Sequence, residues 1–371
     1  MSSSVFRQLY DNRNQFLANW KKQGKKVFGY FCTYSPEELI YAADILPVRV
    51  LADGGSTGLA DAYLPNFICS FARECLDSGL RGEYKDFDGF VSAYTCDTIR
   101  NLLWDWKRLV PSRYIDFISF PSITTNKALD FLLQELNRSK SKLEKFCGRK
   151  ITDQALLKAI RAYNENRALL SKMYDLRKSD PPLISGTEAL DMVRSSMVIS
   201  KEEHSKSLMK FASHAKERDN LPEGRARLLV SGPMVQDISL IETIENVGGL
   251  IVADDLCLGS RYFWDLVPMN GDPLKAIAER YLGRARCPCR HPPEERLDFI
   301  LGMIKDFKVD GVVFLLQKFC DTHFMEHPFM EQKLKENGIP SLLIEIEQST
   351  PIGALKTRVE AFIEMMEGMK S

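Results

Sequence analysis

The chain has 371 residues, of which 44% are hydrophobic and 27% are charged, and its 50 Lys and Arg are balanced by 50 Asp and Glu. This composition excludes a disordered chain, and the zero net charge argues against a nucleic-acid binder or a protein held to membranes by charge. The length exceeds that of one ordinary domain and predicts two or three.

The N-terminus lacks the apolar core of a signal peptide, and no run of 18 or more apolar residues is present to span a bilayer. We therefore expect a cytoplasmic protein. In a reducing compartment, its nine cysteines are expected to be buried thiols or metal ligands rather than disulfides.

Strand and helix patterns alternate from the N-terminus onward, as they do in parallel α/β folds. β-branched and aromatic runs in the first part of the chain predict strands at residues 27–31, 46–51, 89–94 and 115–120. Amphipathic patterns between them predict helices, such as those at residues 35–43 and 128–146.

The middle of the chain, residues 153–216, has an almost wholly helical pattern that is broken by turn residues at 179–186. After a linker-like stretch at 216–224, strands are predicted at residues 227–231, 250–254, 311–316 and 341–346. We therefore predict an α/β fold of two doubly wound (Rossmann- or flavodoxin-like) parallel-sheet domains. The domains are residues 1–152 and 221–371, and a helical connecting segment spans residues 153–220.

Two short motifs lie just past predicted strands. An Asp-Gly run at 88–91 leads to Cys96-Asp-Thr, and another at 310–313 leads to Cys320-Asp-Thr. Ligands of parallel sheets bind outside the carboxyl ends of the strands, so these thiols are expected at a cleft between the domains. A bound metal deprotonates a thiol, and thiolates favour iron–sulfur clusters, zinc or copper(I). The alternative is that these cysteines are small apolar residues of the core.

Further thiols and histidines are candidates for the same cleft. Cys69 follows a Pro-bearing segment and precedes a helical pattern, whose N-terminus would stabilise a thiolate. Cys257 follows a predicted strand, whereas Cys75 is expected in the core. In polar helical sequence, His204 and His214 are predicted to be exposed. His323 and His327 follow Cys320 at helical spacing, and either is a candidate proton donor or a structural residue.

Several motifs, in order along nearly the whole chain, form a recognisable set: Tyr34-Ser-Pro-Glu-Glu-Leu-Ile-Tyr-Ala-Ala, Leu46-Pro, Leu64-Pro, Cys69-Ser, Cys96-Asp-Thr-Ile-Arg-Asn, Ile151-Thr-Asp, Tyr163-Asn-Glu-Asn-Arg, Gln317-Lys-Phe-Cys-Asp, Leu343-Ile-Glu-Ile-Glu-Gln and Thr357-Arg-Val-Glu-Ala-Phe. Together they resemble the 2-hydroxyacyl-CoA dehydratase and benzoyl-CoA reductase family. Each motif alone is weak evidence, and the resemblance depends on their ordered sum.

The resemblance implies two related subunits, each holding a [4Fe–4S] cluster through three cysteines, which match Cys69, Cys96 and Cys320 here. Three thiolates leave one iron open, and that iron can act as a Lewis acid on a thioester carbonyl while the cluster passes a single electron. The resemblance also implies a CoA-thioester substrate and an ATP-hydrolysing iron–sulfur activator protein that delivers the electron.

Two chemistries are implied. In the dehydratases the electron converts a 2-hydroxyacyl-CoA into a ketyl radical, hydroxide leaves, and the electron is recycled. In the reductases, electrons are consumed in partly reducing the ring of benzoyl-CoA. Residues 254–263 and 287–293 resemble the reductase-type subunits, whereas residues 344–348 resemble the dehydratases. We slightly favour ring reduction for this chain, with dehydration as the alternative.

A third group of relatives, the double-cubane proteins, requires additional thiols, for which the candidates are Cys257, Cys287 and Cys289. The run that begins at Cys96, however, resembles that of the single-cubane subunits. The resemblance assigns no acid or base residue. Weak catalytic candidates adjacent to the motifs are Glu37, Ser70, Asp97 and His323.

A rival prediction is a non-enzymatic two-domain module in which Cys287, Cys289 and His291 bind zinc. These residues resemble part of a zinc knuckle, although a second ligand pair is missing. The rival predicts that the remaining thiols are dispersed in the core. A shared cubane instead requires the sulfurs of Cys69, Cys96 and Cys320 to surround one cavity.

Overall fold

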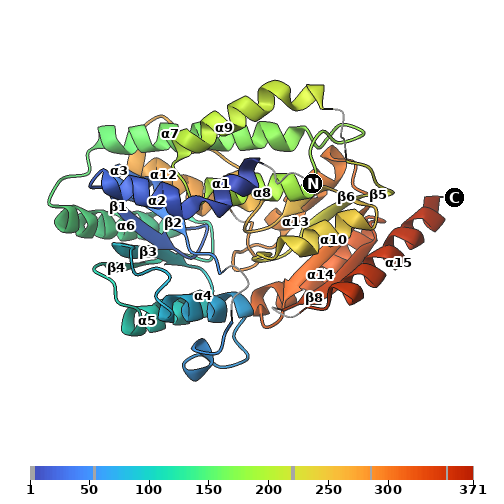
Figure 1. Cartoon of the computed structure of the whole chain (residues 1–371), viewed down its shortest axis with the longest axis horizontal. Coiled ribbons are helices and arrows are strands. Elements are labelled where there is room, and N and C mark those ends of the chain that lie inside the picture. Colours follow the sequence, from blue (N-terminus) through green and yellow to red (C-terminus); the bar gives the residue numbers. More distant parts are fainter. Residues whose placement is uncertain (1–4, 53–55, 219–221, 285, 348–349, 371) are drawn as a thin grey trace.

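The computed structural model describes residues 5–52, 56–218, 222–284, 286–347 and 350–370. Figure 1 shows two sheets side by side, with helices packed around them. The strands are β1 (Lys26–Tyr30), β2 (Ile45–Arg49), β3 (Gly89–Tyr94), β4 (Ile115–Ser119), β5 (Ala226–Ser231), β6 (Gly249–Asp255), β7 (Gly311–Gln317) and β8 (Ser341–Ile346). Each predicted strand is therefore present, with ends that differ by one or two residues at most.

The helices are α1 (Val5–Asp11), α2 (Arg13–Lys22), α3 (Glu37–Ala42), η1 (Ala60–Ala62), α4 (Ser70–Leu80), α5 (Asp97–Leu109), α6 (Asn126–Cys147), α7 (Asp153–Asp175), α8 (Gly186–Ser196), α9 (Lys201–His214), η2 (Ala215–Glu217), α10 (Ile238–Asn246), α11 (Ser260–Phe263), α12 (Pro273–Gly283), α13 (Glu294–Asp306), α14 (Asp321–Glu336) and α15 (Ile352–Lys370).

Both sheets are parallel and have the same strand order. The first is β2-β1-β3-β4 and the second is β6-β5-β7-β8. In each sheet the chain runs from its first strand to a neighbour on one side and then crosses to the other side. This reversal creates a topological switch point between β1 and β3 in the first sheet and between β5 and β7 in the second. This flavodoxin-like order confirms the predicted class of two doubly wound α/β sheets.

The inner strands are buried on both faces, since helices cover both sides of each sheet. All residues of the inner strands β5 and β7 and of the edge strands β2 and β6 are buried, which explains their nearly continuous apolar sequences. The strands at the opposite edges, β4 and β8, are more exposed, and β4 alternates between buried and half-buried positions.

One hydrophobic core passes from the first sheet to the second without interruption. It includes Phe90 and Trp106 in the first half of the chain and Val230 and Leu315 in the second half. In addition, α12 packs against α6 and α7, and its Ile277 lies in the core on one face of the first sheet. A segment from the second half of the chain therefore covers the first sheet, while the domain limits at residues 152 and 220 stay a prediction.

In the helical connecting segment, the N-termini of α7, α8 and α9 are capped by side chains. The side-chain oxygens of Thr152, Ser185 and Ser200 accept hydrogen bonds from backbone N–H groups of the first turns of α7, α8 and α9, and Ser185 forms a capping box with Glu188. Figure 1 shows α7 and α9 running along one side of the molecule, over both sheets.

The prediction that His204 is exposed is wrong. Its ring is fully buried, with Nδ1 2.9 Å from Asn166 Nδ2 and Nε2 3.1 Å from Ser195 Oγ. Burial lowers the pKa of His204 to about 3, so it is neutral. The polar sequence of α9 gives no sign of this burial, because the hydrogen-bond partners of His204 lie on α7 and α8. His214 is exposed, as predicted.

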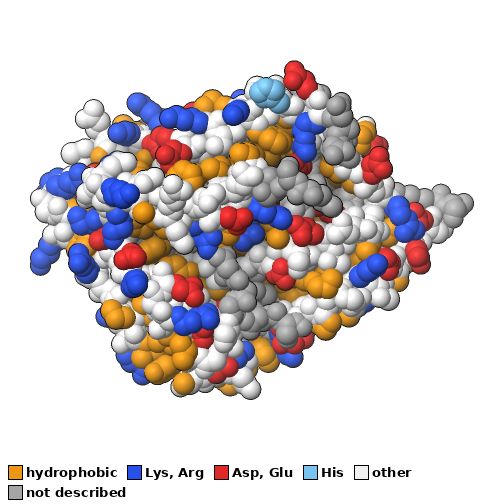
Figure 2. Space-filling model, viewed as in Figure 1, with side chains coloured by type: hydrophobic (Ala, Val, Ile, Leu, Met, Phe, Trp, Pro, Cys, Tyr) orange, Lys and Arg blue, Asp and Glu red, His pale blue; other side chains and the backbone are white. Residues whose placement is uncertain are grey.

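Positive and negative side chains are interspersed on the face drawn in Figure 2. This mixture agrees with the balanced charge of the sequence and gives that face no extended field of one sign. Among the helices of the described residues, none combines the length and the apolar character that a membrane span requires.

Candidate functional site

Seven of the nine cysteines line one cavity between the two sheets. The first half of the chain contributes Cys32, Cys69 and Cys96, and the second half contributes Cys257, Cys287, Cys289 and Cys320. Cys75 is fully buried outside the cavity, as expected of a core residue. The prediction that separate thiols converge at a cleft therefore agrees with this geometry, and we call the space the thiol cavity.

The sheet topology explains why these thiols meet. Cys32 and Cys96 follow β1 and β3, the two strands that flank the switch point of the first sheet. Cys320 follows β7 in the equivalent place of the second sheet, and Cys257 follows β6. Because parallel strands end at the same edge, each sheet directs its thiols to that edge, and the two edges face each other.

Three of the cysteines occupy the same local position, the N-cap of a helix. Cys69 precedes α4, Cys96 precedes α5, and Cys320 precedes α14. The free N–H groups and the dipole of a helix N-terminus stabilise negative charge, including that of a thiolate. Three helix N-termini therefore surround the thiol cavity, at the three cysteines singled out by the resemblance.

Without a bound metal centre these thiols are protonated, although Arg49 and Arg261 also line the cavity. Burial raises the pKa of Cys69 and of Cys320 to about 12, although the backbone N–H groups of Ala72 and His323 act in the opposite direction. A metal centre reverses this balance because it deprotonates the sulfur that it binds. The sulfurs thus require a cationic centre if they are to ionise.

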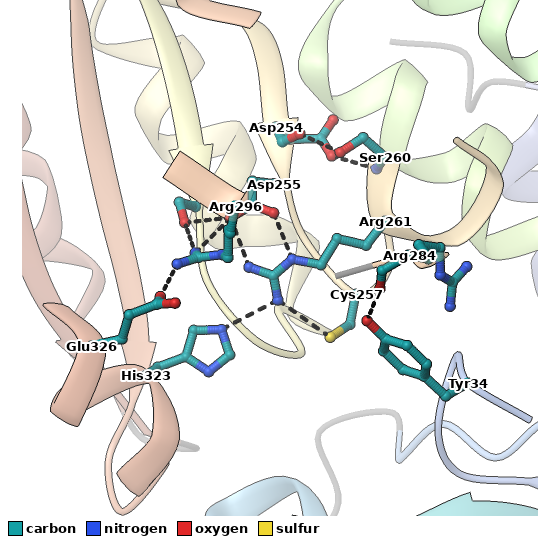
Figure 3. Close-up of polar contacts among 11 residues, drawn as sticks. Tyr34, Asp254, Asp255, Cys257, Ser260, Arg261, Arg284, Arg296, His323 and Glu326 are labelled. Carbon is teal, nitrogen blue, oxygen red and sulfur yellow. Dashed lines mark hydrogen bonds and ion pairs between the residues drawn. The ribbon is translucent and has the colours of Figure 1, made fainter. Parts of the chain in front are cut away.

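A network of buried charges lies behind the second-sheet side of the cavity (Figure 3). Arg261 donates to both carboxylate oxygens of Asp255, at 2.5 and 2.7 Å, and to the sulfur of Cys257, at 3.7 Å. Arg296 also donates to Asp255, at 2.6 Å, and pairs with Glu326. Arg261 and Arg296 are each about 2% exposed, so the network is rigid and nearly dry.

The four weak catalytic candidates lie in different surroundings. His323 lines the thiol cavity, and Ser70 lines a neighbouring cleft. The Asp97 side chain is 83% exposed and pairs with Arg100, so it does not line the cavity.

Glu37 is fully buried in a separate cluster, where Tyr262 donates to it at 3.0 Å and Lys201 Nζ lies 3.6 Å away. This environment gives Glu37 the geometry of a structural ion pair that joins α3, α9 and α11.

The neighbouring cleft is larger and shares Met234 and Gln317 with the thiol cavity. Its wall contains Glu74, a residue that the sequence reasoning did not single out. Glu74 lies one turn after Ser70 on α4 and accepts a hydrogen bond from Gln236 at 3.3 Å. Burial raises the pKa of Glu74 to about 7. The spacing of Ser70 and Glu74 on one helical face was the available sequence signal.

Replacement of Glu74 by Gln is expected to change how stability depends on pH. A carboxyl group with a raised pKa binds more protons in the folded state, so its contribution to stability is lost as pH rises from about 4.5 to about 7. Between pH 5 and pH 8, the wild type should lose about 2–3 kcal/mol more than Glu74→Gln in urea unfolding. Glu165→Gln, at an exposed position on α7, is the control and should behave as the wild type. Equal pH dependence in all three proteins would contradict the assignment.

The predicted zinc trio is not formed. Cys287 and Cys289 line the cavity, but His291 is exposed and does not. Within the described ranges of the chain, no group of three His, Cys, Asp or Glu side chains is close enough to hold a metal ion. The rival's second expectation, dispersed core thiols, also conflicts with the seven cysteines around one cavity.

The donor set of the thiol cavity fits an iron–sulfur cluster better than a single ion. A [4Fe–4S] cluster binds its cysteines through different irons, so these ligands lie farther apart than those of one ion. The cavity offers thiols from two facing sheet edges and helix N-termini that favour negative charge. Soft thiolates, which outnumber every other metal-binding group on the cavity wall, are the ligands that such clusters use.

Comparison with known proteins yields relatives along the whole chain. The chain is 29% identical to the (R)-phenyllactyl-CoA dehydratase beta subunit of Clostridium sporogenes over 367 residues, which cover 97% of both chains. It is also 29% identical to one of the subunits of benzoyl-CoA reductase from Thauera aromatica over 355 residues, 92% of both. A more distant relative, at 22% over 298 residues, is the lactoyl-CoA dehydratase subunit alpha of Anaerotignum propionicum, with 74% of this chain and 68% of the relative covered.

A family model described as "2-hydroxyglutaryl-CoA dehydratase, D-component" matches residues 32–366. The match begins just after β1 and includes the strands β2 to β8 and all seven cysteines of the thiol cavity. It agrees with the resemblance stated from the sequence motifs. The chain therefore belongs to the 2-hydroxyglutaryl-CoA dehydratase D-component family.

Proposed function

We propose that this chain is the [4Fe–4S]-binding subunit of an enzyme that transfers single low-potential electrons to a CoA thioester, with Cys69, Cys96 and Cys320 as the cluster ligands. The observation that carries the proposal is the common placement of these three thiols, each at a helix N-cap on the wall of one cavity. The names of the relatives supply the substrate class.

When bound, such a cluster supplies single electrons and an open iron that acts as a Lewis acid. Groups of the protein itself make the cavity suitable for such a cluster. The N-termini of α4, α5 and α14 and the buried Arg261 favour negative charge on the sulfurs. The cleft that shares Met234 and Gln317 with the thiol cavity provides a route for the acyl end of a substrate.

For the type of reaction, we propose ring reduction, because residues 254–263 and 287–293 resemble the reductase-type subunits. Dehydration of a 2-hydroxyacyl-CoA is the second candidate, since the chain is as similar to a dehydratase subunit as to a reductase subunit, at 29% identity each.

A second cubane is a further candidate because Cys257, Cys287 and Cys289 line the same cavity as the proposed ligands. Cys289 contacts both Cys96 and Cys287, so the two sets of thiols adjoin. Such a centre would correspond to the double-cubane proteins.

The relatives are each named as one subunit of an enzyme, alpha and beta subunits among them, which implies that this chain works with a partner subunit. Similarity to both a beta and an alpha subunit supports a partner related to this chain. We further propose an ATP-hydrolysing iron–sulfur activator as the electron donor, and a cytoplasmic location.

The test is anaerobic co-expression of this chain with the proposed partner subunit and activator. Assays of ATP-dependent benzoyl-CoA reduction and of 2-hydroxyacyl-CoA dehydration follow. The purified subunit is expected to be brown and to hold about four irons and four sulfides. A colourless, iron-free protein after cluster reconstitution would contradict the proposal. Dehydration without ring reduction would replace the first candidate by the second.

A further inference from the structure

We infer that His323 is a positioning residue that donates its Nδ1–H to the sulfur of Cys320, and that Arg261 and Asp255 fix it in this role. This inference rests on the proposed function, in which Cys320 is a cluster ligand. It goes beyond that function because it assigns a hydrogen bond to one particular ligand sulfur and names the residues that orient it.

The geometry begins with the two nitrogens of the ring. His323 Nδ1 lies 3.2 Å from Cys320 Sγ, and its Nε2 lies 3.2 Å from Nη1 of Arg261. Figure 3 shows the ring of His323 with one nitrogen directed at Arg261. His323 is 5% exposed, so water does not compete for either nitrogen to a large extent.

The chemistry of arginine decides which nitrogen carries the proton. A guanidinium only donates hydrogen bonds, so Nε2 of His323 must accept from Arg261. A neutral imidazole then has its proton on Nδ1, which faces Cys320. A charged ring would carry a proton on both nitrogens and could not accept the hydrogen bond from Arg261, so this contact requires the neutral form.

The position of Arg261 is fixed by its other contacts. Its Nε and Nη2 donate to the two oxygens of Asp255, and its Nη1 also donates to the sulfur of Cys257. Asp255 accepts further hydrogen bonds from Arg296 and Ser231, at 2.6 and 2.9 Å. This bidentate pair fixes the direction in which Nη1 of Arg261 points. The hydrogen bond from Nη1 to Nε2 then fixes the orientation of the His323 ring.

The consequence for a cluster is electrostatic. The positive end of an N–H dipole at a ligand sulfur stabilises the reduced form, which carries one more negative charge, and so makes the reduction potential less negative. Loss of the His323 N–H should therefore make the cluster harder to reduce.

The first experiment needs no metal. In the metal-free full-length protein with ¹⁵N-labelled histidine, long-range ¹H–¹⁵N correlations report the tautomer of each of the five histidines. The signals that disappear in His323→Asn identify this ring. The Nδ1–H tautomer is expected, and an Nε2–H tautomer or a charged ring near pH 7 would overturn the inference.

The second experiment measures the midpoint potential of the cluster-loaded subunit. His323→Leu removes the donor and should shift the potential to a more negative value, whereas His323→Asn keeps an N–H near the place of Nδ1 and should restore most of the shift. His327→Leu is the control, because His327 is buried on the same helix but does not line the cavity. An unchanged potential in His323→Leu, or an equal shift in His327→Leu, would overturn the inference.

The two failures are distinguishable. If the wild type binds no cluster, the proposed function fails, and the tautomer spectrum still decides the orientation of His323. If the wild type binds a cluster and His323→Leu has the same midpoint potential, the proposed function stands and only this inference fails.

Discussion

Replacement of Asp255 by Asn is expected to lower the free energy of unfolding by about 3–5 kcal/mol. The carboxylate is fully buried and is the shared acceptor of Arg261 and Arg296. Burial opposes its charge, but the two arginines hold the pKa of Asp255 well below its usual range. Asn keeps the shape and removes the charge, which leaves Arg261 buried without a counter-ion. Denaturant unfolding near pH 7 measures the loss.

Asp97→Asn is the matched control for this substitution. Asp97 is also an aspartate with an arginine partner, but its side chain is 83% exposed, so the change should be below about 1 kcal/mol. A loss for Asp255→Asn as small as that of the control would show that Arg261 finds another partner or admits water.

Single replacement of Cys69, Cys96 or Cys320 by Ala is expected to abolish cluster binding and activity. Each change removes one of three proposed thiolate ligands, and two thiolates hold a cubane poorly. Anaerobic iron and sulfide analysis and the visible spectrum measure the loss. Cys75→Ala is the control, since Cys75 is a buried thiol on the same helix as the Cys69 cap but lies outside the cavity, and it should keep its iron.

The same analysis decides whether a second cubane is present. With one cluster, removal of Cys257, Cys287 or Cys289 leaves about four irons, as in the wild type. With two clusters, the wild type holds about eight irons and each of these changes removes about half of them. Full iron in any single variant of Cys69, Cys96 or Cys320 would contradict the proposed ligand set.

The sheets were predictable because each strand is specified by a local sequence pattern. The inner strands are short, mostly apolar runs, and the Cys-Asp-Thr motifs after β3 and β7 lie at equivalent places in the two sheets. The family motifs then pointed to three cysteines, and the structure brings those three to one cavity.

Other features depend on contacts between distant segments and have no local signature. His204 lies in a polar helix, yet its partners Asn166 and Ser195 belong to other helices. The return of α12 to the first sheet, and the link from Asp255 through Arg261 to His323, likewise need the folded chain. Sequence spacing placed His323 near Cys320 but gave no reason to couple it to Arg261.

The thiol cavity is built from both ends of the chain, and this has a consequence for how the protein matures. Cys69 and Cys96 leave the ribosome early, whereas Cys320 emerges only after most of the chain has been synthesised. Until the second half is made, the wall that carries Cys257, Cys287, Cys289 and Cys320 is missing. Any ligand that needs both walls must therefore be inserted after translation is nearly complete, and the nascent protein has to keep these sulfurs reduced until then.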